Sequence, residues 1–165
     1  AALAQFELDQ LDLVLSRAPL GKAAPEVPTL AERVRVIEAS LASRPAVRVR
    51  TTELRLIADI AAGYDVVVMG ADKWAQVNDV SFYADEADRD AALTRLPQLA
   101  VAARDGVPVP ADAVLDVPAD IDEVSSSAAR AGVLEHMTEA ARAFDARTVA
   151  WSEPSRYRAA GTDNA

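Results

Sequence analysis

Asp65-Val66-Val67-Val68-Met69 is the stretch that decides the fold class. Apolar residues run without a break after the aspartate, so a strand formed here has no polar face to turn toward solvent. A short continuous apolar run of this kind is typical of a strand in a parallel sheet whose two faces are both covered by helices. The stretch therefore predicts a buried parallel strand.

The segments on either side alternate between strand and helix patterns. Thr29 with Glu32 three residues later indicates a capping box and a helix start, and Gly63 indicates a helix end. Strands are predicted over residues 11–16, 46–50, 65–69, 99–103 and 113–117. Helices are predicted over residues 1–8, 29–43, 52–62 and 71–77. Three further helices are predicted: one that ends near residue 96, one that begins near residue 127, and one over 138–146. This alternation predicts a Rossmann-like α/β fold, with a three-layer parallel sheet, helices on both faces and right-handed crossovers.

Length and composition point to one domain. The chain has 165 residues, which is enough to bury a substantial core. Aromatic residues make up only 5%, so we expect a core of small aliphatic side chains, which favours α/β over a β-sandwich. We expect the domain to span residues 1–150, followed by a polar C-terminal tail over 151–165.

Charge and residue usage exclude several classes of function. A net charge of −9 repels polyanions, so nucleic acid is not expected as a partner. The chain has no cysteine and one histidine, His136, which excludes thiolate chemistry and argues against a histidine metal centre. No apolar run reaches the roughly 18 residues of a membrane span. We therefore expect a cytoplasmic protein that has no membrane partner.

Candidate binding residues follow predicted strands, because open α/β sheets bind ligands beyond the carboxyl ends of their strands. After the 65–69 strand, Gly70 allows close backbone approach and Asp72 can accept hydrogen bonds from a ribose. The alternative for both is an ordinary turn and helix start. Lys22 lies on the loop after the first predicted strand, which contains proline and glycine. A lysine there can contact a phosphate, and the alternative is a solvated side chain.

A second candidate group begins a predicted helix nearer the C-terminus. Ser125, Ser126 and Ser127 supply three hydroxyls and free backbone N–H groups at the helix start. Arg130 adds a guanidinium that can bind phosphate through two hydrogen bonds. The combination favours an anion site, and the alternative is a serine N-cap beside a solvated arginine.

Three motifs resemble those of the nucleotidylyltransferase superfamily and occur in the family's order. VSSSAAR over residues 124–130 resembles the ISSTxxR signature, with Ser127 in place of Thr and Ala129 in place of Ile. GADKWAQV over 70–77 is similar to the GxD segment of nicotinate or nicotinamide mononucleotide adenylyltransferases, and PLGK over 19–22 is similar to their PPHK-type loop. The resemblance covers about residues 1–145 and implies that residues 1–150 are a nucleotide-binding domain of this kind.

The resemblance implies transfer of an adenylyl group from ATP, accompanied by Mg²⁺, to nicotinate or nicotinamide mononucleotide. By position it assigns the ATP phosphates to Ser125, Ser126, Ser127 and Arg130, an acceptor or leaving phosphate to Lys22, the ribose to Gly70 and Asp72, and a stacking role to Trp74. For Trp74 a packing role is the alternative. The expected partners are therefore ATP and a small phosphorylated acceptor, and a homo-oligomer is left open.

The family's HxGH motif, whose histidines stabilise charge on the transferred phosphate, does not occur in this sequence. In the family the motif and its strand precede the helix that residues 1–8 would form. We therefore expect that the first strand is missing and that these 165 residues show little or no activity. The alternatives are a catalytically dead nucleotide-binding or interaction module, an adenylyltransferase for another acceptor such as pantetheine phosphate, and a structural domain with chance matches.

Overall fold

The computed structural model describes residues 1–21, 27–104, 106–118, 124, 129 and 133–159. Contacts divide the chain into two compact units. Unit 1 consists of Ala1–Ala23 and Arg50–Ala119, and unit 2 consists of Ala24–Val49 and Asp120–Ala165. The strand β2 (Val47–Thr52) crosses the boundary between them.

The other strands and most of the short helices belong to unit 1. Its elements are α1 (Ala2–Gln5), β1 (Leu11–Ser16), α3 (Ile57–Ile60), β3 (Val66–Gly70), α4 (Ala71–Asn78), the 3-10 helix η1 (Val80–Phe82), α5 (Glu86–Thr94), β4 (Gln98–Ala102), the 3-10 helix η2 (Ala111–Ala113) and β5 (Val114–Leu115).

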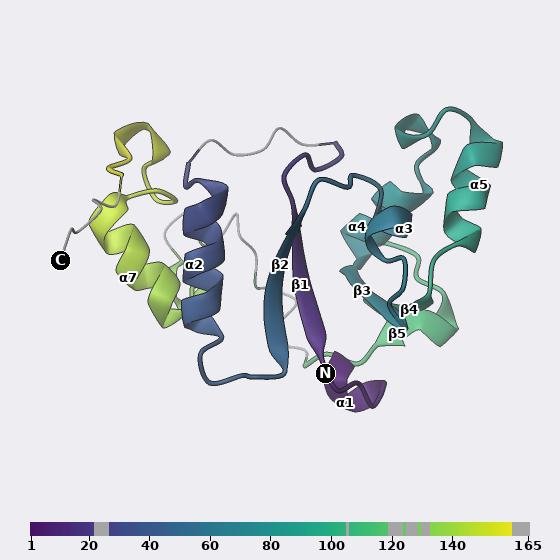
Figure 1. The fold of residues 1–165 in the computed structure, drawn as a ribbon, viewed down its shortest axis with the longest axis horizontal. Helices are drawn as coiled ribbons and strands as arrows, with labels where there is room; N and C mark the ends of the chain where they lie inside the picture. The colour runs from purple at the N-terminus through teal and green to yellow at the C-terminus, as the bar shows by residue number, and fades with distance from the viewer. Residues whose placement is uncertain (22–26, 105, 119–123, 125–128, 130–132, 160–165) are drawn as a thin grey trace. The chain divides into compact units, whose positions relative to one another are not determined.

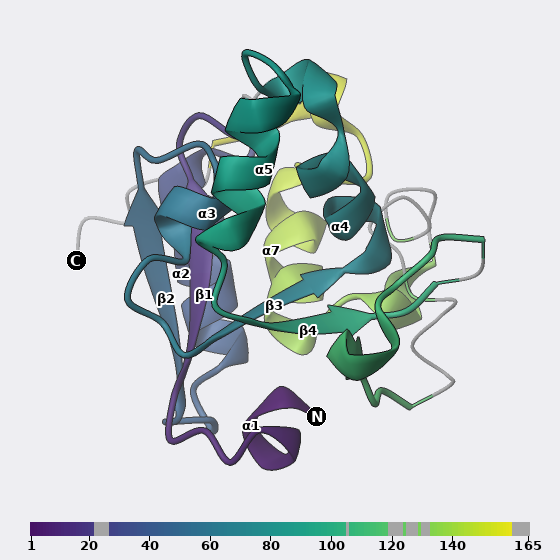
Figure 2. The ribbon, with the colours of Figure 1, turned by 90° about the vertical axis from the view of Figure 1, so that its right-hand side faces the viewer.

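The strands form two small open sheets. In one, β3, β4 and β5 lie in that order and are parallel, with Val66 opposite Gln98 and Gly70 opposite Ala102. Figure 2 shows β3 and β4 side by side. In the other sheet β1 pairs with β2, and the chain enters both strands at the same end (Figure 1). The predicted α/β class with parallel strands is therefore confirmed.

The valine run of β3 supplies apolar contacts on both sides of its sheet, because successive side chains of a strand point to opposite faces. Val67 packs against a cluster that includes the buried Met69 and Val101. Val66 and Val68 pack against the other cluster, formed by Ala2, Ala100 and Leu115. Only Met69 of the run is buried, however, and the three valines keep part of their surface exposed.

Unit 2 contains α2 (Leu30–Ser40), the 3-10 helices η4 (Leu134–His136) and η5 (Pro154–Arg156), and α7 (Glu139–Thr148). The predicted capping box is confirmed: Thr29 Oγ1 accepts from the Glu32 N–H at 3.3 Å, and the Glu32 carboxylate accepts from the Thr29 N–H at 2.8 Å. The α2 helix contacts α7 around a core in which the rings of Phe144 and Trp151 lie 5.2 Å apart and are tilted by 55° to each other. An apolar seam thus joins the two helices.

Most predicted elements are confirmed to within three residues at each boundary. The main error is the helix predicted over 52–62. Thr52 instead ends β2, and the helix α3 covers only Ile57–Ile60. The Thr52 side chain accepts a hydrogen bond from the Leu54 N–H at 3.1 Å, which favours a turn over a helix at this point. The helix predicted from about 127 falls largely outside the described residues.

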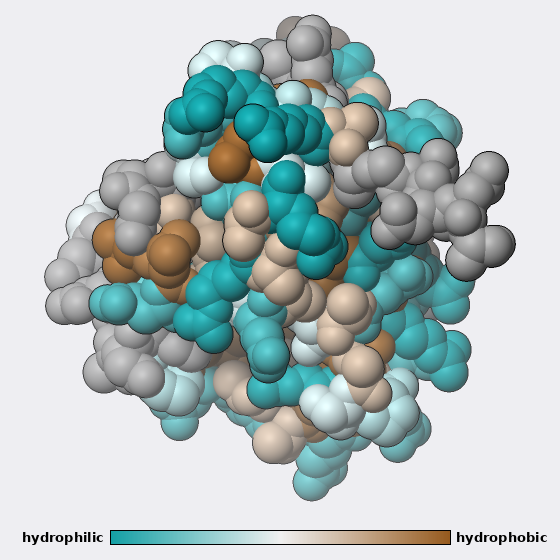
Figure 3. Space-filling view, turned by 90° about the vertical axis from the view of Figure 1, so that its left-hand side faces the viewer, coloured by the Kyte–Doolittle hydropathy of each residue, from teal (hydrophilic) through white to brown (hydrophobic). Residues whose placement is uncertain are grey.

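Figure 3 shows one face of the molecule, on which hydrophilic residues predominate and the strongly hydrophobic ones form small separate patches. Among the described residues, none of the helices has the length and apolar character needed to cross a lipid bilayer.

Candidate functional site

A crevice lies at the carboxyl ends of β1 and β2. It has a volume of about 190 Å³ and is bordered by three segments of unit 1: the end of β1 with its following loop, residues 55–60 after β2, and α4 with η1 behind it. Polar and charged side chains reach it from each segment, namely Ser16, Arg55, Lys73 and Gln76. We call this site the carboxyl-end crevice.

Hydrogen bonds to backbone hold the two loops that shape the crevice. The Ser16 hydroxyl donates to the Leu54 carbonyl at 2.7 Å, which ties the end of β1 to the segment after β2. The Gln76 amide on α4 donates to the Leu20 carbonyl at 3.0 Å. Gly21 continues this loop with a φ of +73°, and a Cβ there would collide with Gln76 and Phe82. The loop can therefore lie this close to α4 only with glycine at position 21.

Two cationic side chains border the crevice. Arg55 is exposed and makes no ion pair with any residue that the structure describes. Lys73, in the first turn of α4, donates to the side-chain oxygen of Gln76. A guanidinium and an ammonium at the mouth of a crevice suit an anionic group such as phosphate.

The predicted glycine-aspartate corner is located at the carboxyl end of β3. Gly70 is the N-cap of α4, and a Cβ built on it would meet nothing within 4 Å. The neighbouring Asp72 carboxylate pairs with the Arg104 guanidinium at 2.8 Å, with 67% and 47% of their side chains exposed. The corner is thus open to solvent, and its carboxylate already has a cationic partner.

Trp74 packs in the core. It lies on α4, is partly buried, and packs against the cluster formed by Met69, Ala71, Val77, Val101 and Ala113. This position matches the packing alternative for Trp74, because a ring held among apolar side chains contributes burial energy to the fold.

The remaining candidates, Lys22, Ser125, Ser126, Ser127 and Arg130, lie outside the described residues. Their assignment to phosphate therefore stays a prediction from the sequence motifs.

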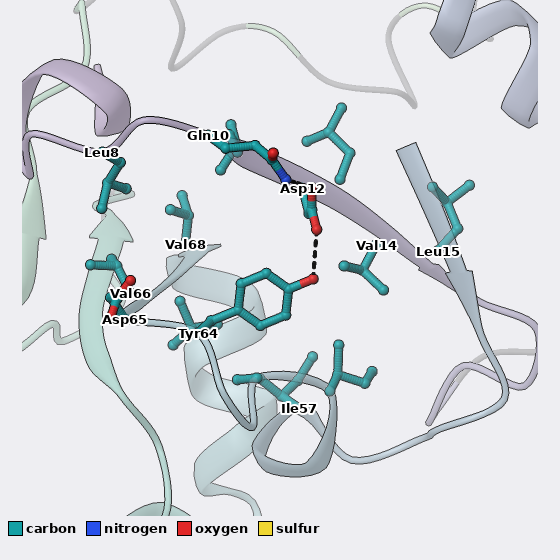
Figure 4. Close-up of a pocket in the computed structure, with 15 residues that line it drawn as sticks. Leu8, Gln10, Asp12, Val14, Leu15, Ile57, Tyr64, Asp65, Val66 and Val68 are labelled. Carbon is teal, nitrogen blue, oxygen red and sulfur yellow. Dashed lines mark hydrogen bonds between the residues drawn. The ribbon is translucent and has the colours of Figure 1, made fainter. Parts of the chain in front are cut away.

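A larger cavity, of about 360 Å³, lies between β1 and β3. Side chains from both strands line it together with α3 and Tyr64, as Figure 4 shows. Although β1 and β3 border the same cavity, they belong to different sheets, so no hydrogen-bond ladder joins them. We call this cavity the β1–β3 slot.

One buried carboxylate interrupts the apolar lining of the slot. Only 4% of the Asp12 side chain is exposed, and its oxygens accept hydrogen bonds from Gln10 at 2.6 Å, Tyr64 at 2.8 Å and Arg50 at 2.5 Å. Burial acts to raise the pKa of Asp12, but the hydrogen bonds from Tyr64, Arg50 and Gln10 and the charge of Arg50 outweigh it, so the pKa lies below its ordinary value. The hydrogen bond to Asp12, followed by burial, raises the pKa of Tyr64. The carboxylate is thus ionised at neutral pH with its charge matched.

The sequence analysis missed Arg55 and Asp12. Arg55 falls inside a predicted helix, whereas in the structure it follows the end of β2 and borders the crevice. For Asp12 a signal was available, because it is the single charged residue in the apolar run LDLVLS. A charged group on a buried strand requires hydrogen-bonding partners, and the structure supplies three.

Comparisons with known proteins place the chain in no family: no family model matches it, and neither a curated protein nor a solved structure is significantly similar to it.

Proposed function

We propose that this protein binds a nucleotide, and that its fold is a Rossmann-like three-layer sheet of the nucleotidylyltransferase type. The position of the carboxyl-end crevice carries the proposal. The crevice lies beyond the ends of β1 and β2 and beside the helix that follows β3, which is where open α/β sheets bind ligands. Arg55 supplies positive charge there, which a phosphate group requires.

The nucleotide that we propose is ATP with Mg²⁺, and the acceptor is a small phosphorylated molecule such as nicotinate or nicotinamide mononucleotide. The sequence motifs assign phosphates to Arg130 and to the three serines that precede it. They assign a ribose to Gly70 and Asp72. For this role the Asp72 carboxylate exchanges Arg104 for a ribose hydroxyl, and an ion pair this exposed is worth at most about 1 kcal/mol, so the exchange costs little.

We propose binding without efficient turnover for these 165 residues. Adenylyl transfer requires stabilisation of the charge that develops on the transferred phosphate, and the HxGH motif that supplies it in the resembled family does not occur in the sequence. Nucleotide binding without catalysis is also what the alternative, a catalytically dead nucleotide-binding module, would show. A cytoplasmic location accompanies both versions of the proposal.

Calorimetric titration with ATP and Mg²⁺, followed by nicotinate mononucleotide, tests the proposal. Loss of one charged hydrogen-bond donor to phosphate costs about 1.5–3 kcal/mol, so we expect Arg130→Gln and Arg55→Gln each to weaken ATP binding about ten-fold or more. The matched control is Arg142→Gln, which removes the same charge from an exposed position on α7 and should leave the affinity unchanged. No heat of binding at millimolar ATP, or equal effects of all three variants, would contradict the proposal.

A further inference from the structure

We infer that the β1–β3 slot accepts one extended, uncharged, apolar peptide strand supplied in trans by another polypeptide. The inference stands independently of nucleotide binding, because it concerns a different cavity of unit 1. Side chains of β1 such as Val14 and of β3 such as Val68 line this cavity together, so both strands present it with an edge. Neither edge has a partner strand among the described residues.

The direction of known hydrogen bonds identifies the backbone groups at these edges. The Asp65 carbonyl accepts from Gln98 next to β4, and the Arg17 N–H donates to Thr52 next to β2. Within a strand, the backbone groups of neighbouring residues point to opposite sides. The groups of Val66 and Val68 in β3, and those of Asp12 and Val14 in β1, therefore point away from the existing ladders and toward the free edges.

Each sheet has an inner edge strand that borders the slot, β1 or β3, and an outer edge strand at its other side, β2 or β5. The outer edge strands differ from the inner ones. β2 carries Arg48 and Arg50, both exposed, and β5 has only the two residues Val114–Leu115. Charged residues and very short strands are features by which proteins prevent unwanted strand pairing. β1 and β3 are both longer than β5, and apart from Asp12 they carry no charge, unlike β2. The inner edges thus lack the protection that the outer edges have.

The lining of the slot defines the chemistry of its occupant. Two carboxylates line the slot. Asp12 on β1 is already matched by Arg50 and by hydrogen bonds, and Asp65, directly before β3, is exposed to solvent, so a charge buried at the centre of the occupant would find no counter-charge there. The partly exposed valines of β3 gain burial only from apolar side chains. The unpaired backbone N–H and C=O groups of β1 and β3 require an occupant whose own backbone can form hydrogen bonds along both edges. A single extended strand meets this requirement.

An inserted strand would also be continuous with the ladders already present. It would join β2 and β1 to β3, β4 and β5 in one parallel sheet, which is the arrangement of doubly wound folds. Within the part of the chain that the structure describes, a second copy offers no comparable strand, because its outer strands are the arginine-bearing β2 and the two-residue β5.

Amide hydrogen exchange of the whole chain, with and without the capped, uncharged heptapeptide TVVVGVT, tests this inference. In the free chain we expect fast exchange at Val66 and Val68 and slow exchange at Val67 and Met69, whose amides face β4. At saturating peptide we expect exchange to slow at least about ten-fold at Val66, Val68 and Val14. Unchanged exchange at saturating peptide would overturn the inference. So would slow exchange without peptide that rises with protein concentration, because it would show that a second copy pairs with these edges.

A proline substitution provides a matched test of the same edges. Val68→Pro removes one N–H from the free edge of β3 and leaves the β4 ladder intact, so peptide affinity should fall about ten-fold or more. Val49→Pro makes the same change on the outward-facing side of β2 and should leave the affinity within about two-fold. Equal affinity of the two variants would contradict strand addition. If Val68→Pro does not fold, the exchange pattern of the unmodified chain decides the question.

Discussion

The two sides of β3 differ in how completely they are packed. On the side of β4 the backbone is paired along the whole strand, and Ala100 and Val101 have no exposed surface. On the side of β1 there is no backbone pairing, and a cavity of about 360 Å³ separates the strands. The same valine run therefore contributes to a finished core on one side and to an unfilled space on the other.

The packed side of β3 stabilises the fold, whereas the open side leaves space in which a ligand could fit. A closed core resists any change of volume because its atoms are already in contact, whereas an open cavity has room for added atoms. The carboxyl-end crevice is a third environment, since it is smaller than the slot and is bordered by cations and loop carbonyls. Unit 1 thus has a packed region that holds it together and two cavities whose linings differ in polarity and charge.

The largest expected effect is a loss of stability when a phenylalanine is introduced on the packed side of β3, compared with the same substitution on the side of the slot. Val101→Phe adds a ring to a fully buried position and should destabilise the fold by about 3 kcal/mol. Val14→Phe places the same ring in the slot and should change stability by less than about 1 kcal/mol. Urea unfolding followed by circular dichroism measures both. Comparable losses for the two variants would show that the slot is closed in solution.

The fold could be predicted from local sequence signals wherever one signal dominates. The valine run determined β3, and Thr29 with Glu32 determined the start of α2. The prediction of a helix over 52–62 was wrong because apolar periodicity alone cannot show that the backbone turns where the Leu54 N–H donates to the Thr52 side chain. The sequence also could not show that β1 and β3 belong to separate sheets, because the pairing of strands far apart in sequence depends on tertiary packing.

The next largest effect concerns the buried charge beside the slot. Asp12→Asn replaces a carboxylate that accepts three charged or polar hydrogen bonds, so we expect a loss of about 2 kcal/mol at pH 7. The pKa of Asp12 is lowered by folding, so its stabilisation is complete above the unfolded pKa of about 3.9 and is lost as pH falls through the lower folded value. Unfolding free energies measured between pH 7 and pH 2 should therefore converge for the unmodified chain and the Asp12→Asn variant. A difference that stays constant down to pH 2 would rule out this role of the charge.

The candidate site was predictable only in part. Gly70 and Asp72 were predicted because residues after a central parallel strand lie at the ligand edge of the sheet, and the structure locates both at the start of α4. Their relation to Arg104 was not predictable, because that arginine follows β4 and the strand register brings it near. For Trp74 the motif suggested a ligand, and the structure shows a partly buried side chain on α4 that packs against the core, so the stacking role stays a prediction.

The smallest expected effect tests whether the Asp72 corner is available to a ligand. Arg104→Gln removes the partner of an ion pair whose side chains are both about half or more exposed, so stability should change by less than about 0.5 kcal/mol. Because salt screens exposed pairs, even this difference should vanish in 1 M NaCl, where the Debye length is about 3 Å. Thermal unfolding at low and high salt measures it, with Asp12→Asn as the buried comparison. A loss above about 1 kcal/mol that persists in salt would mean that Arg104 fixes the corner structurally. Asp72 could then not exchange this partner for a ribose at little cost, and the ribose assignment would fail while Arg55 and the crevice remained.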